Sequence, residues 1–336
     1  MPTSKGDHHM PRRRAFALLV CLAAVTACGS SSVPAFQRPP TGPLCGWRDA
    51  PPATYKHVVW LLQENTSESD VIGNGDLPLI NGTLVPQCGL ATNYHNVSHG
   101  SLPNYLGLTS GTGGGSREAG NCQPADCPQT QPNLFEQVQA AGGTWGEYAR
   151  SMTSKCDPVK DSNYEPEHAV PVYYTDLRST CQSRDVPPGD PGGGALRAEL
   201  DRGRLPTFTF ITPDGDTESG AGGDRWLGDW ITLIAASPAY RSGDTAIFVT
   251  WDEGGGSDKS GGESCADSAH ADVHAYPSCW VATLVISPST RPGMKSGAYF
   301  NHYSLLRTTE DMLGLNVRLG HAADERTVSM RSAFNL

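Results

Sequence analysis

The chain has 336 residues, of which 38% are hydrophobic, and a formal net charge of -10. That length is enough for one large α/β domain or two small ones. The acidic balance argues against a general nucleic-acid-binding protein, which needs a basic surface to contact phosphates. It does not exclude a small anionic substrate, because one local positive site can outweigh the overall charge.

The first 28 residues have the layout of an export signal. Three arginines at 12–14 precede an apolar run over 15–25, which is too short to span a bilayer. The run ends in VTAC, which resembles the lipobox of bacterial lipoproteins, whose cysteine is lipidated after cleavage. We predict an exported protein anchored to the membrane by a lipid on Cys28. The alternative is cleavage nearby and release of a secreted protein.

The composition then changes twice. Residues 29–53 are rich in Ser, Pro and Gly and are predicted to be a tether, whereas residues 54–336 are predicted to be one domain.

Eight cysteines remain outside the signal, and an even number in an exported chain predicts four disulfides. Zinc is less favoured, because no CxxC pair occurs. The connectivity stays open, and the pairs that close short loops are 122–127, 156–181 and 265–279.

Buried strands and helices are expected to alternate along this domain. Strands are predicted where short runs rich in β-branched or aromatic residues are bounded by Pro, Gly, Asp or Asn. These runs are Lys56–Gln63, Thr207–Thr212, Thr245–Thr250 and Trp280–Ser287. Helical patterns cover Leu102–Thr109, Asn133–Ala141, Ala195–Arg202, Gly228–Ala236 and Tyr303–Leu313. The alternation predicts one doubly wound α/β domain with a mostly parallel sheet and disulfide-stapled loops over 111–132, 151–192 and 253–278.

Polar residues follow these strands, at the edge where open α/β sheets bind ligands. Glu64-Asn65 follows the first strand, Asp214 the second, Asp252-Glu253 the third and Ser287 the fourth. Carboxylate, amide and hydroxyl oxygens are ligands that Mg²⁺, Ca²⁺ or Mn²⁺ prefers. An acidic residue after a strand is also a common turn former or helix cap, so each pair alone is a weak signal.

The stretch HNVSHGSLPNYLGLTSGT places Ser101 at the first turn of a predicted helix. A helix N-terminus favours phosphate and alkoxide, and a bound metal would lower the pKa of the hydroxyl and supply a nucleophile. The simpler interpretation is that Ser101 only caps the helix. His99 could bind a phosphate oxygen or donate a proton, or it could be a polar surface histidine.

Four motifs together resemble a known family. They are HVVWLLQEN, SHGSLPNYLGLTSG, VTWDEGGG and NHYSLLRTTEDMLGL, in that order, and the likeness runs from about residue 56 to residue 334. The chain is similar to the bacterial phosphoesterases that include acid phosphatases and non-haemolytic phospholipases C. The resemblance implies an alkaline phosphatase-like fold and hydrolysis of phosphate esters with one divalent ion, which could be Mg²⁺, Ca²⁺, Mn²⁺ or Zn²⁺.

The resemblance also implies roles for individual residues. The metal ligands are Glu64, Asn65, Ser101, Asp252 and Glu253. Ser101 is also the nucleophile that forms a phosphoseryl intermediate, and His302 is a candidate acid for the leaving group. His99 and His168 fall where related chains carry histidines, the first as a catalytic and the second as a substrate-binding candidate. Asn104 is placed to donate to a phosphate oxygen or to cap the helix.

The chain departs from the family in one segment. Small members carry a Pro-Asn…Asp-x-His-Asp run after the second strand, whereas this chain has ITPDGDTESGAGGDRWL without a histidine. Asp214, Asp216 or Asp224 could keep part of that role, and His270 or His274 could compensate. The loss leaves protonation of the leaving group, or the choice of substrate, open.

We therefore predict a phosphatase acting on phosphate monoesters of a small molecule or of a phospholipid head group, with no nucleic-acid partner. The first alternative is a phosphodiesterase of the phospholipase C kind, for which the chain is short. The second is a lipoprotein that binds a phosphorylated or sugar ligand without turnover. A nucleophile among the predicted site residues argues against the second, because binding alone does not need one.

Overall fold

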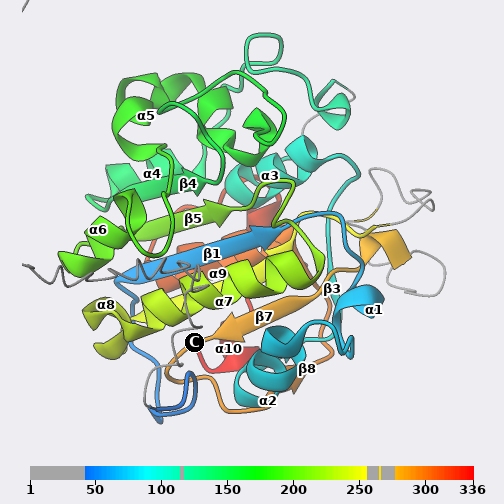
Figure 1. Ribbon diagram of the computed structural model, residues 1–336, viewed down its shortest axis with the longest axis vertical. Coiled ribbons are helices and arrows are strands. Elements are labelled where there is room, and N and C mark those ends of the chain that lie inside the picture. The colour runs from blue at the N-terminus through cyan, green and yellow to red at the C-terminus, as the bar shows by residue number, and fades with distance from the viewer. Residues whose placement is uncertain (1–41, 114–116, 256–264, 266–276) are drawn as a thin grey trace, which may run out of the picture. The chain divides into compact units, whose positions relative to one another are not determined.

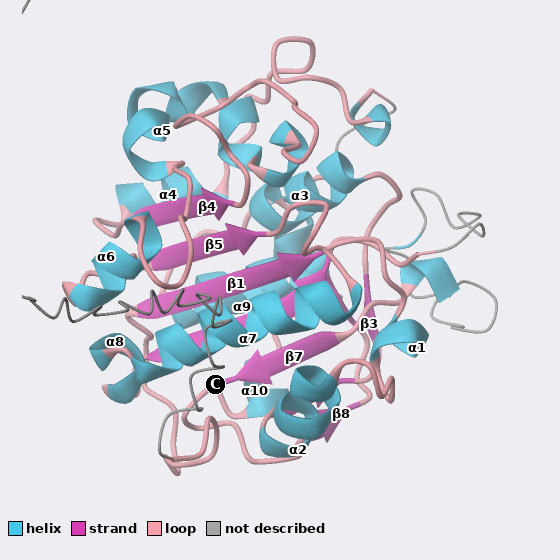
Figure 2. Ribbon diagram, in the orientation of Figure 1, coloured by secondary structure: helices cyan, strands magenta, loops and turns pink. Residues whose placement is uncertain are grey.

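A computed structural model describes residues 42–113, 117–255, 265 and 277–336 of the chain. A seven-stranded sheet with strand order β4-β5-β1-β6-β7-β2-β8 forms the centre of this part, and a two-stranded sheet pairs β3 with β9. Figure 1 shows α7 across the near face of the large sheet and α9 behind it. Figure 2 shows the long loops and short helices that gather beyond β4.

The strands are β1 (His57–Gln63), β2 (Gly89–Ala91), β3 (Tyr94–His95), β4 (Trp145–Ala149), β5 (Phe208–Thr212), β6 (Thr245–Trp251), β7 (Thr283–Ile286), β8 (Lys295–Ser296) and β9 (Phe300–Asn301). The α-helices are α1 (Glu68–Val71), α2 (Val85–Gln87), α3 (Ser101–Ser110), α4 (Leu134–Ala140), α5 (Arg178–Arg184), α6 (Ala195–Asp201), α7 (Gly220–Ala236), α8 (Pro238–Arg241), α9 (His302–Met312) and α10 (Arg331–Phe334). A short π-helix, η1 (Ile80–Leu84), and 3₁₀ turns such as η3 (Pro166–His168) occur in the connections.

The direction of the strands confirms most of the predicted sheet and corrects one strand. β4, β5, β1 and β6 run parallel, whereas β7 runs antiparallel to β6. The end of β7 therefore lies at the edge opposite to the ends of β1 and β6. Ser287 follows β7 there, within 3.3 Å of the Tyr55 hydroxyl, so the expectation that it joins the other strand ends is wrong.

Burial on both faces explains the nearly continuous apolar character of the central strands. In β1 only His57 is partly exposed, and all seven residues of β6 are buried. Trp60 packs edge-on against Phe208, and its indole donates to Thr309 of α9 at 3.1 Å. The core thus joins the sheet to the helix behind it, which holds the strand ends at fixed positions.

Four disulfides staple the described part of the chain, as predicted. Three are the short-loop pairs 122–127, 156–181 and 265–279, and the fourth joins Cys45 to Cys88. Leu44 and Cys45 are buried, so this part of the predicted tether is held against the domain. The predicted signal and Cys28 lie outside the described residues. No helix in the described part is long and apolar enough to span a membrane.

Candidate active site

The ends of β1 and β6 bring three of the predicted metal ligands together. Gln63 and Trp251 are paired across the two strands, so the residues that follow them, Glu64 and Asp252, lie side by side. Asn65 has a φ of 49°, a conformation that asparagine tolerates, and its backbone N–H donates to Asp252 Oδ1 at 3.0 Å. The Asn65 side chain is exposed, with Nδ2 3.5 Å from Glu64 Oε2.

The glycines after Asp252-Glu253 allow backbone segments to pack closely around these strand ends. A Cβ on Gly254 would lie 2.6 Å from the Ser278 carbonyl oxygen, and a Cβ on Gly255 would lie 2.5 Å from the Asn65 carbonyl oxygen. Both distances are too short for a side chain. These glycines therefore allow a close approach, and it is made to the protein's own backbone.

Ser101 begins α3 and faces Glu64. Its Oγ donates to Glu64 Oε2 at 3.1 Å, and the residue is 6% exposed. Gly100, immediately before the helix, has a φ of 92°, and a Cβ there would lie 2.6 Å from the Ala119 carbonyl oxygen. This tight turn requires glycine and aims the serine at the strand ends. The neighbouring helix N–H, on Leu102, donates to Asn121 Oδ1 at 3.0 Å, so an anion would compete for it.

Two more side chains enclose the Glu64 carboxylate. The Tyr105 hydroxyl donates to Oε1 at 2.5 Å, and His168 Nε2 lies 3.3 Å from Oε2. The Tyr105 and His168 rings are stacked, with centroids 5.4 Å apart. Sequence analysis identified His168 but missed Tyr105. The available signal was its position one helical turn after Ser101, which places both on one face of α3.

The two carboxylates at the centre are poorly solvated and repel each other. Burial raises the pKa of Glu64 to about 8, although hydrogen bonds with Asp252 and Tyr105 lower it. Burial, and then the charge of Glu64, raise the pKa of Asp252 well above its ordinary value. Asp252 Oδ2 is buried without a hydrogen-bond partner among the described residues. An unpartnered oxygen beside a second carboxylate fits a cation, which would compensate both charges.

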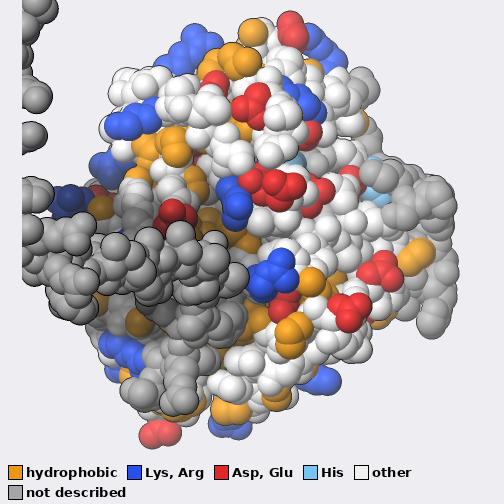
Figure 3. Space-filling model, viewed as in Figure 1, with side chains coloured by type: hydrophobic (Ala, Val, Ile, Leu, Met, Phe, Trp, Pro, Cys, Tyr) orange, Lys and Arg blue, Asp and Glu red, His pale blue; other side chains and the backbone are white. Residues whose placement is uncertain are grey.

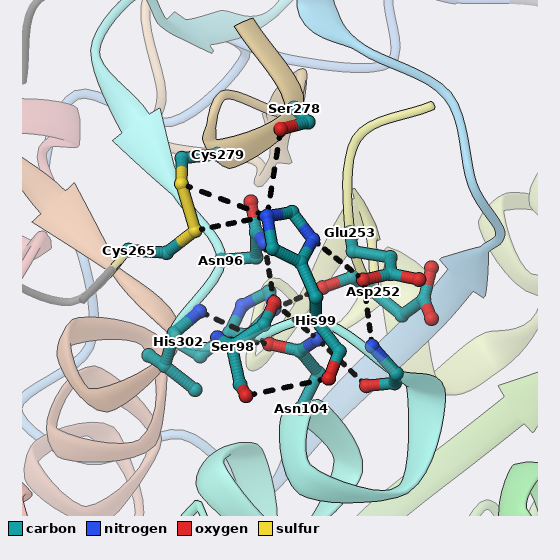
Figure 4. Close-up of a disulfide and its surroundings, with 12 residues drawn as sticks. Asn96, Ser98, His99, Asn104, Asp252, Glu253, Cys265, Ser278, Cys279 and His302 are labelled. Carbon is teal, nitrogen blue, oxygen red and sulfur yellow. Dashed lines mark hydrogen bonds and ion pairs between the residues drawn. A yellow bond between two sulfur atoms is a disulfide. The ribbon is translucent and has the colours of Figure 1, made fainter. Parts of the chain in front are cut away.

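Glu253 points toward His99 instead of Glu64. Its Oε2 lies 2.9 Å from His99 Nδ1 and accepts from the Gly100 backbone N–H at 2.8 Å. His99 Nε2 lies 3.4 Å from Ser278 Oγ and 3.5 Å from Cys265 Sγ. Figure 4 shows the imidazole between Glu253 and the 265–279 disulfide. Predicted as a catalytic residue, His99 is thus bound to a predicted metal ligand and packed against a disulfide.

His302 supports the β6 end from behind. Its Nε2 donates to the backbone carbonyl of Asp252 at 2.6 Å, and its Nδ1 accepts from the Tyr94 hydroxyl at 3.1 Å. It is fully buried, and burial lowers its pKa to about 4, against the hydrogen bond to the Asp252 carbonyl. Both ring nitrogens are used within the protein, so this arrangement does not fit the predicted role as an acid that faces Ser101.

Asn104 uses its whole carboxamide within the loop before α3. Oδ1 accepts from the N–H groups of Val97 and Ser98 at 3.0 and 3.1 Å. Nδ2 donates to the carbonyls of Ser98 and Gly100 at 2.9 and 3.0 Å. The residue is fully buried. Donation to a phosphate oxygen would break these bonds, so the geometry fits a loop-holding residue and not the predicted substrate ligand.

The divergent segment after β5 does not supply a replacement acid from Asp214. Its carboxylate accepts from Arg150 Nε at 2.9 Å, from the Ser151 hydroxyl and from the Thr217 hydroxyl. Burial alone would raise the pKa of Asp214, but the hydrogen bonds of Ser151 and Thr217 and the charge of Arg150 lower it. Asp214 is therefore held ionised by neighbouring polar groups.

The remaining acids of this segment have different surroundings. Asp224 accepts from the backbone N–H groups of Leu79 and Ile80 and so holds the start of η1. The backbone carbonyl of Glu218 accepts from the Glu64 N–H at 3.0 Å, and the carboxylate is close enough to Glu64 to raise its pKa. Glu218, an acid of this segment that the sequence analysis did not name, therefore lies beside Glu64. His270 and His274 lie outside the described residues.

The predicted residues thus fall into three groups. Glu64, Asn65, Ser101, Asp252 and His168 gather at the ends of β1 and β6. Glu253 and His99 form a pair beside this centre, while His302 and Asn104 lie behind it. Elsewhere in the described residues, some groups of three acidic, His or Cys side chains bring their ligand atoms within 4.8 Å of one another. Glu64, Asp252 and Glu253 do not. Glu253 would have to turn away from His99 to join a common cation.

Comparison with known proteins identifies relatives of this chain. The profile of the Phosphoesterase family matches residues 74–316. Phosphatidylinositol-3-phosphatase of Mycobacterium tuberculosis is 26% identical over 271 residues, which are 78% of this chain and 78% of that protein. Acid phosphatase of Aspergillus fumigatus is 23% identical over 271 residues, which are 76% of this chain and 54% of that protein. The chain thus spans about half the length of this fungal relative.

Solved structures share the fold at low sequence identity. An alkaline phosphatase superfamily protein from Vibrio parahaemolyticus is similar with a TM-score of 0.53 and 13% identity, over 85% of this chain and 74% of that one. A putative sulfatase from Bacteroides thetaiotaomicron gives a TM-score of 0.51 with 11% identity, over 84% of this chain and 75% of that one. These likenesses confirm the predicted alkaline phosphatase-like architecture and concern the fold alone.

Proposed function

Since the chain belongs to the Phosphoesterase family and is a phosphoric ester hydrolase, we propose that it hydrolyses phosphate monoesters through attack of Ser101 on phosphorus. The predicted family is confirmed, which also disfavours the alternative of a lipoprotein that only binds its ligand. One observation carries the proposal. Ser101 Oγ lies at the N-terminus of a buried helix and donates to Glu64 Oε2 at 3.1 Å, at the ligand-binding edge of the sheet.

The donor set fits one divalent cation. Glu64, Asp252 and Ser101 would hold it, with Asn65 and Glu253 completing the set, and oxygen donors favour a hard ion such as Mg²⁺, Ca²⁺ or Mn²⁺. When bound, such an ion would lower the pKa of the serine hydroxyl and offset negative charge on the phosphoryl group. The unpartnered, buried oxygen of Asp252 supports this assignment.

The chain's own residues then account for the first step. The Ser101 proton leaves along the hydrogen bond to Glu64 Oε2, and Oγ attacks phosphorus in line with the leaving oxygen. The bond from phosphorus to the leaving oxygen breaks as the phosphoseryl bond forms, and water later releases phosphate. Tyr105 keeps the Glu64 carboxylate in position through its hydrogen bond to the other oxygen.

We assign the leaving-group proton to His168 and a positioning role to His302. Ser101 and His168 share Glu64 Oε2, at 3.1 and 3.3 Å, so the histidine borders the place where the reaction occurs. His302 instead holds the backbone of Asp252, and Asn104 holds the loop that leads to Ser101. His99 keeps Glu253 at the rim of the site.

The substrate class follows from the relatives. The names of the fungal relatives favour acid-phosphatase activity on small phosphate monoesters, and the mycobacterial relative is named for a phosphatidylinositol 3-phosphate activity. Both activities remove a phosphate that is bound as a monoester, so we place phosphodiesterase activity of the phospholipase C kind second. A lipid on Cys28 would hold the enzyme near a phospholipid substrate. Palmitate labelling of the full chain, lost in Cys28→Ala, would support that anchor, and label retained in the variant would contradict it.

The decisive test compares p-nitrophenyl phosphate with bis-p-nitrophenyl phosphate as substrates of the chain from Gly29 onward. We expect turnover of the monoester that EDTA abolishes, that added divalent ion restores and that Ser101→Ala loses. A matched variant, Ser110→Ala at the other end of α3, should keep activity. Full turnover by Ser101→Ala would refute the nucleophile assignment, and preference for the diester would favour the phospholipase C alternative.

A further inference from the structure

A second cavity lies at the opposite edge of the sheet from Ser101. It has a volume of about 660 Å³ and is lined by Trp145 and Tyr148 of β4 and by Leu205 and Pro206, which precede β5. Because β4 and β5 run parallel to β1, their beginnings lie away from the strand end that carries Glu64. The cavity is therefore separate from the candidate active site, and its size is that of a small-molecule pocket.

One wall of this cavity is fixed by a disulfide and by backbone hydrogen bonds. Lys155 precedes Cys156, which is bonded to Cys181 in α5, and Arg184 ends the same helix. The Gln182 side chain donates to the Lys155 carbonyl at 3.1 Å. The Val186 N–H, just after the helix, donates to the Glu147 carbonyl of β4 at 3.0 Å. The Cys156 N–H donates to the Asp185 carbonyl at 2.9 Å. Lys155 and Arg184 thus stand on anchored backbone.

The opposite wall is α6 and the turn that follows it. Glu199 of α6 lies between Arg202 and Arg204, which approach its Oε1 at 3.4 and 3.1 Å. Both arginines follow the C-terminus of α6, where a positive charge is favourable, and both pair with Glu199. They therefore also stabilise the end of this helix. Because one carboxylate is paired with two guanidinium groups, this wall keeps a net positive charge.

Positive charge is concentrated here in an otherwise acidic protein. Four cations, Lys155, Arg184, Arg202 and Arg204, and one carboxylate, Glu199, line the cavity, a formal charge of +4 - 1 = +3. The whole chain has 25 Lys and Arg against 35 Asp and Glu. Within the described part of the chain, Lys155 and Arg184 form no ion pair with an acidic side chain. Figure 3 shows basic side chains beside hydrophobic surface over this region.

The cationic groups surround an aromatic floor. The Tyr148 ring folds back over Gly146, where a Cβ would lie 2.8 Å from the ring, so the missing side chain leaves room for it. Tyr148 is close enough to Glu199 and Arg184 for both charges to affect its hydroxyl. An occupant would therefore meet aromatic and aliphatic surface below and guanidinium and ammonium groups around it. Such a surface suits a ring-shaped body that carries two or more anionic groups.

We propose that this cavity is a second, non-catalytic site for a polyphosphorylated small molecule, such as a phosphorylated cyclic polyol, either free or as the head group of a lipid. Arginine and lysine recognise phosphate through charge-assisted hydrogen bonds, and the apolar floor accommodates the carbon ring. The anionic character of the ligand follows from the cavity, whereas the choice of phosphate over carboxylate rests on the proposed function.

The test uses the full mature chain carrying Ser101→Ala, which prevents turnover of the probe. Isothermal titration with myo-inositol 1,4,5-trisphosphate examines the free ligand, and flotation with vesicles containing phosphatidylinositol 4,5-bisphosphate examines the lipid. The cavity variant is Lys155→Gln with Arg184→Gln. The control is Arg291→Gln with Arg326→Gln, two exposed arginines elsewhere, which removes the same charge. Both pairs are also made with Ser101 intact to measure p-nitrophenyl phosphate hydrolysis.

We expect the cavity variant to bind about tenfold more weakly or worse in at least one arm, and the control to bind as the parent does. Loss in the titration arm identifies the free phosphate as the source, and loss in flotation alone identifies the lipid. Hydrolysis of p-nitrophenyl phosphate should be unchanged in both pairs, which separates this site from the proposed function. Binding that is absent in both arms, or is equal in the cavity and control variants, would overturn the proposal.

Discussion

Tyr105 offers a sharp test of how the candidate active site works. Its hydroxyl donates to Glu64 Oε1 at 2.5 Å while Ser101 donates to the other oxygen. Tyr105→Phe removes one oxygen atom and keeps the ring that stacks on His168. The carboxylate would then lose its firmest hydrogen bond in a fully buried position. The change therefore isolates the contribution of this bond to the position of Glu64.

The expected size follows from the burial and charge of the acceptor. A hydrogen bond to a charged group contributes about 1.5–3 kcal/mol, and a buried oxygen left without a partner costs a comparable amount. If Glu64 acts on Ser101 and on a cation, that loss corresponds to a decrease of about 10- to 150-fold in kcat/KM. The carboxylate should also bind the cation less well, so less EDTA should be needed to halve the activity.

The assay measures kcat/KM for p-nitrophenyl phosphate and the EDTA concentration for half inactivation. Tyr174→Phe is the matched control, because its buried hydroxyl contacts Thr109 of α3 at 2.8 Å and not Glu64. Both variants should lose about 1 kcal/mol or more of unfolding free energy. Only Tyr105→Phe should lose activity. Activity within twofold of wild type in a folded Tyr105→Phe enzyme would show that the tyrosine does not position the carboxylate.

Three further predictions concern the histidines and a disulfide. Burial lowers the pKa of His95 to about 4, so the unfolded state binds its proton first as the pH falls. The contribution of neutral His95 to the free energy of unfolding is thus fully present above pH 6.5 and decreases toward pH 4. Between pH 7 and 4.5 this should cost about 2.5 kcal/mol, so urea unfolding should find that His95→Gln loses about 2.5 kcal/mol less over this range than wild type or a His321→Gln control, while the loss due to His302 remains in all three. His168→Asn should lower kcat by about 100-fold and change the pH profile of kcat, whereas His302→Asn should mainly weaken cation binding. Identical pH profiles of kcat in the two variants would contradict their separate assignments. Replacing Cys265 and Cys279 together by serine should lower kcat/KM about tenfold by loosening His99 and Glu253, while the same change at Cys156 and Cys181 should affect stability alone. Equal catalytic loss in both pairs would indicate general unfolding.

Local composition was sufficient to find the central strands but not their directions. β1, β5 and β6 are apolar along their length because helices cover both faces of the sheet. β4 was missed, since WGEYA contains a glycine and a glutamate, and Glu147 is nevertheless fully buried. The antiparallel direction of β7 could not be inferred, because an apolar run has the same pattern in either direction. Strand direction depends on the connections, which only the folded chain shows.

The carboxylates of the site could be predicted for a related reason. Parallel strands end at one edge, so acids that follow β1 and β6 must meet there, whatever else the chain does. Tyr105 was not predicted, because a tyrosine inside an apolar helix has the same sequence pattern as a residue of the hydrophobic core. The role that we propose for it depends on a contact with Glu64, 41 positions earlier in the chain.

The three candidate histidines show what decides a side chain's role once the fold is formed. In sequence each is a polar residue next to a motif, and each could donate a proton. In the structure His302 has both nitrogens occupied by the Asp252 carbonyl and Tyr94, and burial keeps its ring neutral. His99 is held by Glu253. His168 alone among them borders the carboxylate that faces Ser101. A proton donor must have a nitrogen directed at the reacting group, and this requirement separates positioning from catalysis in residues of the same chemistry.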